Sequence, residues 1–374
     1  MLTGGKLTSF RKQLLAWFRQ FQRDLPWRRT KDPYGIWVSE IMLQQTRVAA
    51  VIPYYERFLA RFPDVRALAE APQEEVLRLW SGLGYYSRAR NLQRAAQQIV
   101  ALHHGEFPED EESIFALPGI GSYTGAAILS IAFGAERAVL DGNVARVLAR
   151  LGAIRGALRE SHRWQSLQKT AGDLLDPKSP GAWNQAMMEL GAMVCTPRAP
   201  QCLVCPAAKF CRARQLGDPE SFPEKRKKPE AVQILLAAAV LHTPCGQTLL
   251  LPPPEKKTES RPAAEDIATL VSRMWHFPTV AIRQDSSAEL RNFLADFLSP
   301  ENGTIHVQPL AKVRHAVTYR NLTVLPFRIA VARIPHIRGA KSLRLEDFAK
   351  VPVSNLTRKI ARAALRRTQA AGEQ

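Results

Sequence analysis

The sequence lacks the features that mark membrane and secreted proteins. No apolar run approaches the length of a membrane span, and residues 1–6 lack the apolar segment of a signal peptide. Acidic residues are scarce, because 34 Asp and Glu stand against 52 Lys and Arg, which leaves a net charge of +18. That surplus favours a polyanionic partner, with nucleic acid preferred over a membrane surface. We therefore expect a soluble cytoplasmic protein, associated with the nucleoid in a prokaryote, that binds nucleic acid and no membrane.

Cysteine is also scarce, with five residues in 374. In a reducing compartment such thiols serve as metal ligands or stay free rather than form disulfides. Four of them fall within seventeen residues, at Cys195, Cys202, Cys205 and Cys211. Four thiolates suit either a tetrahedral zinc ion or an iron–sulfur cluster, and the spacing by itself leaves both open.

The chain changes character along its length. Residues 1–212 carry apolar residues at helical spacing, interrupted by short Gly and Pro segments, which predicts an all-α domain. Residues 213–229 hold three prolines and a basic run, a composition typical of a linker. Strand patterns predominate in residues 230–370, with a helix expected at 263–272 among others. We expect a multidomain protein in which an all-α domain precedes an α+β domain.

One helix of the first domain is expected to set a carboxyl among apolar side chains. On a helix that begins after Pro33, positions three and four residues from Glu40 share its face, and they include Ile36, Trp37 and Leu43. An apolar setting disfavours the charged carboxylate, so the pKa of Glu40 should rise. A carboxyl that keeps its proton near neutral pH can act as a general acid. The competing interpretation is a surface glutamate whose apolar neighbours face the core.

A glycine-containing turn, Leu117-Pro-Gly-Ile-Gly, lies between two expected helices. Gly119 and Gly121 permit positive φ and a close backbone approach. The amides that follow open a helix at its positive end, which suits a phosphate. Such contacts position a duplex without reading its sequence. An ordinary helix–loop–helix with glycine caps is the competing interpretation.

Together these segments resemble the adenine DNA glycosylases, the MutY family, over nearly the full length of the chain. The resemblance rests on the strings Trp37-Val-Ser-Glu-Ile-Met-Leu-Gln-Gln-Thr46, Gly82-Leu-Gly-Tyr-Tyr-Ser-Arg88, Leu117-Pro-Gly-Ile-Gly121, Val139-Leu-Asp-Gly-Asn-Val144 and Trp183-Asn-Gln-Ala-Met-Met-Glu-Leu-Gly191, and on the cysteine spacing. It implies a helix-hairpin-helix motif at 111–134, an iron–sulfur loop at 195–211 and a Nudix-like C-terminal domain. It also implies a monomeric enzyme that removes adenine paired with 8-oxoguanine or guanine in duplex DNA.

The resemblance further implies a role for individual residues. Glu40 would protonate adenine N7, and Asp141, otherwise a plain helix N-cap, would stabilise the oxocarbenium ion or form a covalent intermediate. Tyr123 and Asn143 would hold these carboxyls and the attacking water. The residues expected at the flipped base and the DNA are Trp27, Arg28, Leu43, Gln45, Thr46, Leu83, Tyr85, Gly119, Gly121, Glu189, Thr318 and Tyr319. The ligands of a [4Fe–4S] cluster would be Cys195, Cys202, Cys205 and Cys211.

Two other functions compete with this one. The endonuclease III type is a bifunctional pyrimidine glycosylase and AP lyase, with a nucleophilic lysine where this chain has Tyr123 and no glutamate at the place of Glu40. Without that amine no Schiff base with the sugar can form there, so we expect a monofunctional enzyme. The second competitor is a catalytically silent DNA-binding module with a structural zinc ion.

The C-terminal domain departs from its relatives in two ways. It has no Glu-rich metal helix of the kind that Nudix hydrolases need, so phosphohydrolase activity is not expected. The loop that inspects 8-oxoguanine in the family typically reads Phe-Ser-His, and the corresponding residues are Val317, Thr318 and Tyr319. A hydroxyl survives at Thr318 and a polar-tipped ring at Tyr319, so we expect recognition of 8-oxoguanine in a weakened form.

Overall fold

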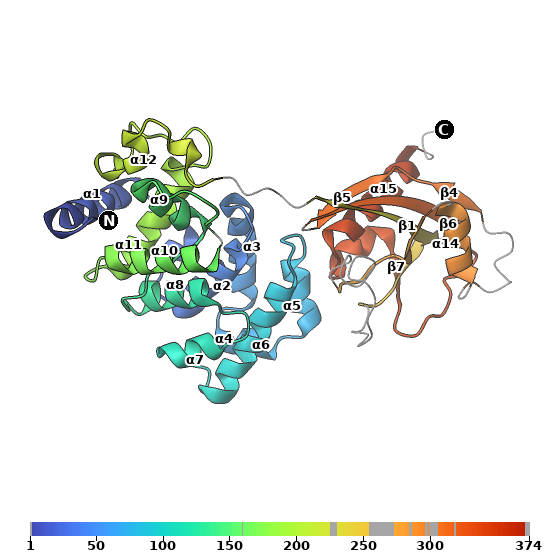
Figure 1. Cartoon of the computed structure of the whole chain (residues 1–374). Coiled ribbons are helices and arrows are strands. Elements are labelled where there is room, and N and C mark those ends of the chain that lie inside the picture. The colour runs from blue at the N-terminus through green and yellow to red at the C-terminus, as the bar shows by residue number, and fades with distance from the viewer. Residues whose placement is uncertain are drawn as a thin grey trace. The chain divides into compact units, whose positions relative to one another are not determined.

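A computed structural model describes residues 2–158, 160–224, 230–253, 273–283, 286–295, 298, 306–317 and 319–370 (Figure 1). The chain divides into two compact units. The first unit joins Met1–Ala71 to Asn91–Lys227, and the second joins Pro72–Arg90 to Lys228–Gln374. The helix expected at 263–272 lies outside the described residues.

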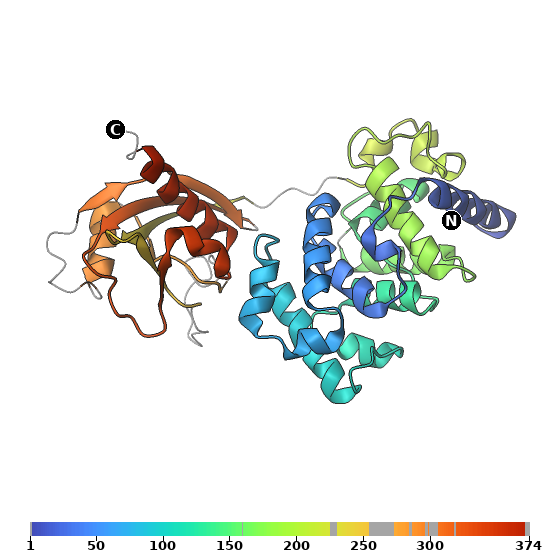
Figure 2. The ribbon, with the colours of Figure 1, turned by 180° about the vertical axis from the view of Figure 1, so that it is seen from behind.

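The described part of the first unit is helical throughout (Figures 1 and 2). Its elements are α1 (Gly4–Phe21), η1 (Pro26–Arg28), α2 (Pro33–Leu43), α3 (Val48–Arg61), α4 (Val65–Glu70), α6 (Ser87–Leu102, whose first turn belongs to the second unit), α7 (Glu111–Ala116), α8 (Ser122–Ala132), α9 (Gly142–Gly152), α10 (Ser161–Leu174), α11 (Pro180–Glu189), η2 (Leu190–Val194), η3 (Ala208–Phe210), α12 (Arg212–Gln215) and η4 (Pro219–Ser221). Among the described residues no helix has both the length and the apolar character of a membrane span.

Helix α2 is central because almost all of it is buried. Asp32 caps its N-terminus by accepting hydrogen bonds from the amides of Tyr34 and Gly35, and Pro33 occupies the first turn, where its missing N–H costs nothing. Every residue from Tyr34 to Met42 is buried. A helix that is apolar all round belongs inside a domain, so its one acidic side chain, Glu40, is carried into the interior.

The helix-hairpin-helix expected at 111–134 is present as α7, a tight turn and α8. Gly119 has φ +83°, a conformation that glycine adopts without strain. Gly121 instead has φ −99° and forms the N-cap of α8. Of the two glycines that permit positive φ, only Gly119 adopts it. No side chain caps α8, which leaves its first amides available to another acceptor.

Helix α11 does not continue in α-helical form as far as the cysteine-containing loop. Helix α11 stops at Glu189, and the next five residues, η2, form a π-helical turn. Its closing hydrogen bond joins the Cys195 amide to the Leu190 carbonyl at 2.7 Å. This wider turn lies between α11 and the cysteine-containing loop, and such turns occur often at functional sites.

The second unit contains α5 (Gln73–Trp80) and the strand-containing C-terminal part of the chain. Its elements there are β1 (Val232–His242), β2 (Gln247–Leu250), β3 (Thr279–Ala281), α14 (Ser286–Ala295), β4 (Val307–Pro309), β5 (Val313–Val317), β6 (Arg320–Ala330), β7 (Lys341–Arg344), η6 (Leu345–Lys350) and α15 (Asn355–Ala370). Strand β1 pairs in parallel with β6 and antiparallel with β3, while β4 and β5 both pair with β6. Strand β2 pairs with β7 in a separate two-stranded sheet, so the strands that flank the turn at 244–246 do not pair with each other.

Alternation along β1 builds a core on each face of the five-stranded sheet. Leu236, Ala238 and Val240 pack in the cluster that contains the apolar residues of α15. Ala237, Ala239 and Leu241 pack in the other cluster, with α14. Figures 1 and 2 show the two helices on opposite faces of the sheet. Both faces are covered, which explains why β1 reads as a continuous apolar run in the sequence.

Helix α11 packs on α8 through a glycine that has no room for a methyl group. A Cβ at Gly181 would lie 2.5 Å from the Ser130 carbonyl oxygen and 2.8 Å from the Ile131 Cα. We expect Gly181→Ala to destabilise the first unit by about 1–3 kcal/mol, because backbone atoms must move. Gly172 is an exposed glycine near the end of α10 with open space around it, so Gly172→Ala should stabilise by about 0.5–1 kcal/mol. Urea unfolding of both variants measures the difference, and equal effects would contradict the packing argument.

Candidate active site

The described part of the first unit contains a cavity of about 680 Å³. It opens between η1, α2, the turn before α8, the start of α9 and the end of α11. Most of the residues that the sequence singled out line it: Trp27, Arg28, Glu40, Leu43, Gln45, Thr46, Gly119, Gly121, Tyr123, Asp141, Asn143 and Glu189. Five separate segments of the chain thus contribute to one cavity.

Glu40 projects into this cavity from the buried helix α2 and is 5% exposed. Its Oε2 accepts a hydrogen bond of 2.6 Å from the Tyr123 hydroxyl. Burial raises the pKa of Glu40 to about 7, against the lowering effect of the Tyr123 hydrogen bond and with a further rise from the nearby charge of Asp141. The same surroundings raise the pKa of Tyr123 well above its usual value, so the phenol stays a donor. Glu40 therefore holds its proton in an appreciable fraction of molecules at neutral pH.

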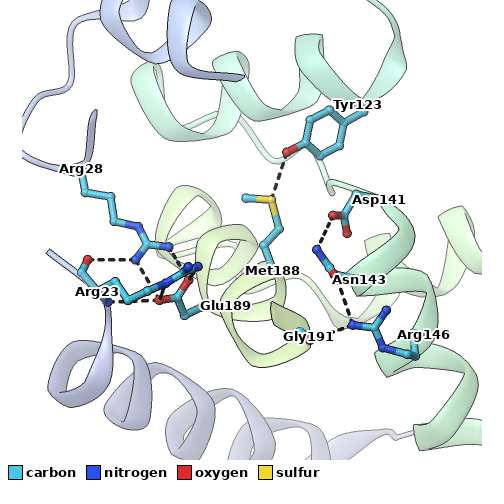
Figure 3. Close-up of polar contacts among 9 residues, drawn as sticks. All are labelled: Arg23, Arg28, Tyr123, Asp141, Asn143, Arg146, Met188, Glu189 and Gly191. Carbon is cyan, nitrogen blue, oxygen red and sulfur yellow. Dashed lines mark hydrogen bonds and ion pairs between the residues drawn. The ribbon is translucent and has the colours of Figure 1, made fainter. Parts of the chain in front are cut away.

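Asp141 fulfils the helix-cap interpretation and also lines the cavity. Its Oδ1 accepts from the Val144 amide at 2.7 Å, which caps α9. Its Oδ2 accepts from Asn143 Nδ2 at 3.0 Å (Figure 3). Burial raises the pKa of Asp141, and the hydrogen bonds from residues 143 and 144 and the charge of Arg146 act against that rise. The two carboxyls of the cavity are thus held differently, since Glu40 has a phenol donor and Asp141 has several.

Asn143 is itself held from the other side by Arg146, one turn further along α9. Arg146 Nη2 donates to Asn143 Oδ1 at 2.9 Å and to the Gly191 carbonyl at 2.7 Å (Figure 3). Its Nε donates to the carbonyl of Cys195 at 2.8 Å. Arg146 therefore joins the carboxamide beside Asp141 to the end of the π-helical turn.

Glu189 lines the cavity as an ion-paired carboxylate and is 1% exposed. Its two oxygens accept from the side chains of Arg23 and Arg28, with Nη2–Oε2 distances of 2.6 Å and 2.9 Å, and from the Arg23 amide (Figure 3). Burial alone would raise the pKa of Glu189, but these hydrogen bonds outweigh it and lower the pKa to about 2. With both oxygens engaged by arginines, this carboxylate serves chiefly to hold Arg23 and Arg28 in place.

Sequence reasoning missed Arg23, Gln185 and Met188, which line the cavity, and Arg146, which donates a hydrogen bond to the cavity residue Asn143. Gln185 lies four residues before Glu189 on α11, so helical spacing from Glu189 could have found it. Met188 Sδ lies 3.3 Å from the Tyr123 hydroxyl. No local pattern marks Arg23, because its partner Glu189 is distant in sequence. Arg146 lies three residues after Asn143 on α9, so helical spacing from Asn143 could have found it.

Some predicted DNA-contacting residues lie elsewhere. Leu83 is buried and Tyr85 is 42% exposed, and both belong to the second unit. Tyr319 is exposed, with the Arg320 guanidinium 4.8 Å from its ring centroid. Thr318 lies outside the described residues. Gln45 and Tyr85 have φ of 57° and 48°, a left-handed conformation that costs energy for residues with a Cβ and is concentrated at functional sites.

The four cysteines of 195–211 lie around one small cavity. Arg150, which is 2% exposed, lies beneath them and donates to Cys195 Sγ at 3.3 Å and to the Thr196 carbonyl at 2.7 Å. Among the described residues, no three His, Cys, Asp or Glu side chains are placed as ligands of one metal ion.

The helix-hairpin-helix fold and the cavity beside it are those of a base excision DNA repair protein, and the comparisons agree. Residues 38–171 match the model of the HhH-GPD superfamily of base excision DNA repair proteins. A solved thermostable thymine-DNA glycosylase superposes with a TM-score of 0.52 at 29% identity, covering 56% of this chain and 97% of that one. A non-covalent endonuclease III–DNA complex gives 0.50 at 24% identity, covering 58% and 99%, and supports the fold alone.

The closer likeness is at the level of sequence. The adenine DNA glycosylase of Homo sapiens is 36% identical over 408 residues, which cover 96% of this chain and 74% of the human protein. The chain belongs to the adenine DNA glycosylase family of base-excision repair enzymes.

The buried Glu40 should make stability depend on pH. Between its ordinary pKa of 4.5 and its folded value of about 7, the folded carboxyl keeps a proton that the unfolded one has lost. Unfolding then releases a proton, so stability falls as pH rises through this window.

Glu40→Gln keeps an acceptor for Tyr123, and its stability should not depend on pH in this way. We expect it to gain roughly 3 kcal/mol over the wild type between about pH 4.5 and about pH 8. Urea unfolding of both proteins at the two pH values measures the difference in their free energies of unfolding. If that difference did not change with pH, the charged form of Glu40 would not be destabilised by burial.

Proposed function

We propose that this protein hydrolyses the N-glycosidic bond of adenine paired with 8-oxoguanine or guanine in duplex DNA, as a monofunctional glycosylase. The observation that carries the proposal is the pair of carboxyls in one cavity, Glu40 beneath the Tyr123 hydroxyl and Asp141 at the start of α9. Their surroundings are those that an acid and a charge-stabilising carboxylate require. That the excised base is adenine rests on family membership, and the geometry of the cavity supports the roles of the individual residues.

Glu40 is proposed as the proton donor to the departing adenine. A pKa of about 7 lets the carboxyl carry a proton at neutral pH and still release it in the transition state. Tyr123 directs one carboxyl oxygen and leaves the other free to face the base at N7. Once deprotonated, Glu40 can help to deliver the water that completes hydrolysis.

Asp141 is proposed to face the sugar. As the base departs, positive charge grows at C1′, and a nearby carboxylate lowers the energy of that charge. Asn143 and the Val144 amide hold the Asp141 carboxylate by its two oxygens. The same carboxylate could attack C1′ to give a covalent intermediate that water then opens.

The rest of the cavity is proposed to hold the flipped adenine. Trp27 and Leu43 supply apolar walls, and Arg28, held by Glu189, supplies fixed donors. Gln45 and Thr46 lie at the cavity and are proposed to occupy the gap in the duplex, with Leu83 and Tyr85. The uncapped start of α8 and Gly119 would contact a phosphate, in keeping with the net charge of +18.

Monofunctional chemistry is supported by the cavity lining. Among the residues that the structure describes there, none is a lysine, and Tyr123 occupies the hairpin position of the lyase nucleophile. A phenol cannot form a Schiff base with the opened sugar.

We propose that Cys195, Cys202, Cys205 and Cys211 hold a [4Fe–4S] cluster. In such a cluster each thiolate binds a different iron, so ligands arranged around a cavity fit it. When bound, the cluster ties the loop together. Arg150 beneath the loop adds a positive charge that suits four thiolates.

The C-terminal part is proposed as a Nudix-like domain that inspects the base opposite adenine. Its supports are a mixed sheet covered by helices on both faces and the exposed ring of Tyr319 at the start of β6. We further propose that the protein acts as a monomer in the cytoplasm.

Single-turnover cleavage after alkali tests the function directly. Duplexes with adenine opposite 8-oxoguanine and adenine opposite guanine should give product, whereas 8-oxoguanine opposite cytosine should not. Glu40→Gln should abolish base release while duplex binding persists, since it removes the acidic proton and little else. Product from the third duplex alone would contradict the proposal.

Borohydride trapping separates this proposal from the bifunctional alternative. An efficient lyase gives a strong protein–DNA cross-link through its imine, and we expect none beyond background. Visible absorbance of the purified protein separates a cluster from zinc, which is colourless.

The opposite-base preference tests the C-terminal residues. Thr318→Val combined with Tyr319→Ala should reduce the preference for adenine opposite 8-oxoguanine over adenine opposite guanine, because both polar groups of the loop are lost. The ratio of the two single-turnover rates measures this. Tyr54 in α3 is half-buried and, like Tyr319, has an arginine over its ring, with the Arg57 guanidinium 4.7 Å from the ring centroid, so Tyr54→Ala offers a control. If the ratio of rates were unchanged in the double variant, Thr318 and Tyr319 would have no role in recognising 8-oxoguanine.

A further inference from the structure

Gly191 lies in the π-helical turn and touches the residue that holds Asp141. A Cβ built on Gly191 would lie 2.7 Å from Asn143 Cβ and 3.0 Å from both the carbonyl carbon and the carbonyl oxygen of Asn143. These atoms belong to the backbone and to the first side-chain atom of Asn143, so no rotamer change can make room. Gly191 is not among the glycines with positive φ. The requirement for glycine here is therefore one of space and not of conformation.

The close approach serves the network that ends at Asp141. Because the π turn brings Gly191 against α9, its carbonyl can accept from Arg146 Nη2 at 2.7 Å. The same Nη2 donates to Asn143 Oδ1 at 2.9 Å, which turns the Nδ2 end of the carboxamide toward Asp141 at 3.0 Å (Figure 3). A displaced Asn143 would lose one or both of these hydrogen bonds.

We propose that Gly191 is a positioning residue for base excision. Only a residue without a side chain lets η2 approach α9 closely enough to hold the Asn143 carboxamide against Asp141. The inference rests on the proposed role of Asp141 beside the sugar. It adds a residue that touches neither base nor sugar and that acts through Asn143.

The test compares Gly191→Ala with Gly172→Ala. Gly172 also lies within a helix of the first unit, but a methyl group there meets nothing. We expect Gly191→Ala to lower the single-turnover rate of adenine release about a hundredfold, as displacement of a reacting group by about 1 Å does. The affinity of Gly191→Ala for a duplex with an abasic analogue should stay close to that of the wild type. For Gly172→Ala, both the rate of adenine release and the duplex affinity should stay close to the wild-type values.

Two further readouts separate positioning from damage to the fold. The burst amplitude counts active molecules, and the rate loss should remain after correction for it. The decline in rate as Glu40 loses its proton near pH 7 should persist, because Glu40 lies on α2 and is not displaced. A rate loss that the burst amplitude explains in full, or an unchanged rate, would overturn the inference.

A crystal structure of Gly191→Ala decides the geometric part without reference to activity. The Asn143–Asp141 hydrogen bond should be broken, and an intact bond would also overturn the inference. If the wild type released no adenine, the proposed function would be wrong. The Asn143–Asp141 hydrogen bond in the Gly191→Ala crystal structure would still test the geometric part of the inference.

Discussion

The hydrogen bond between the Tyr123 hydroxyl and Glu40 is the contact on which the first unit depends. It joins α2, the most buried helix around the cavity, to α8 of the hairpin. A second link between the same helices runs from the Gln44 side chain to Thr124 Oγ1 at 3.2 Å. These two hydrogen bonds fix the position of the Glu40 carboxyl relative to the hairpin, whose uncapped helix end suits a phosphate. A glycosylase needs both groups in fixed positions, because the DNA backbone must be held while one base is extruded.

Keeping an acid inside a helix of apolar residues has an energetic cost. The charged form of Glu40 is destabilised, and one phenol donor offsets only part of that. Glu189 shows the opposite arrangement at the other end of the cavity, where two arginines stabilise the charge fully. The two glutamates have the same chemistry and are buried to a similar degree, yet their pKa values lie about five units apart because of their partners.

The cysteine-containing loop is connected to the cavity through backbone as much as through side chains. Arg146 and Arg150, one turn apart on α9, both donate to residues 195–197. The π-helical turn runs directly into Cys195. Any group that holds the four thiolates would therefore also hold the start of α9, where Asp141 lies.

The sequence by itself determined the helical domain, the hairpin, the buried setting of Glu40 and the cap at Asp141, because each depends on residues close in the chain. Helical spacing and capping are local properties, so the hairpin begins at residue 111 as predicted and Asp141 caps α9. Only the tertiary structure decided that Glu189 is an ion-paired support, that β2 leaves the main sheet for β7, and that α11 ends in a π turn. Those outcomes depend on partners far away in the sequence, such as Arg23 for Glu189 and Asn143 for Gly191, which no local pattern identifies.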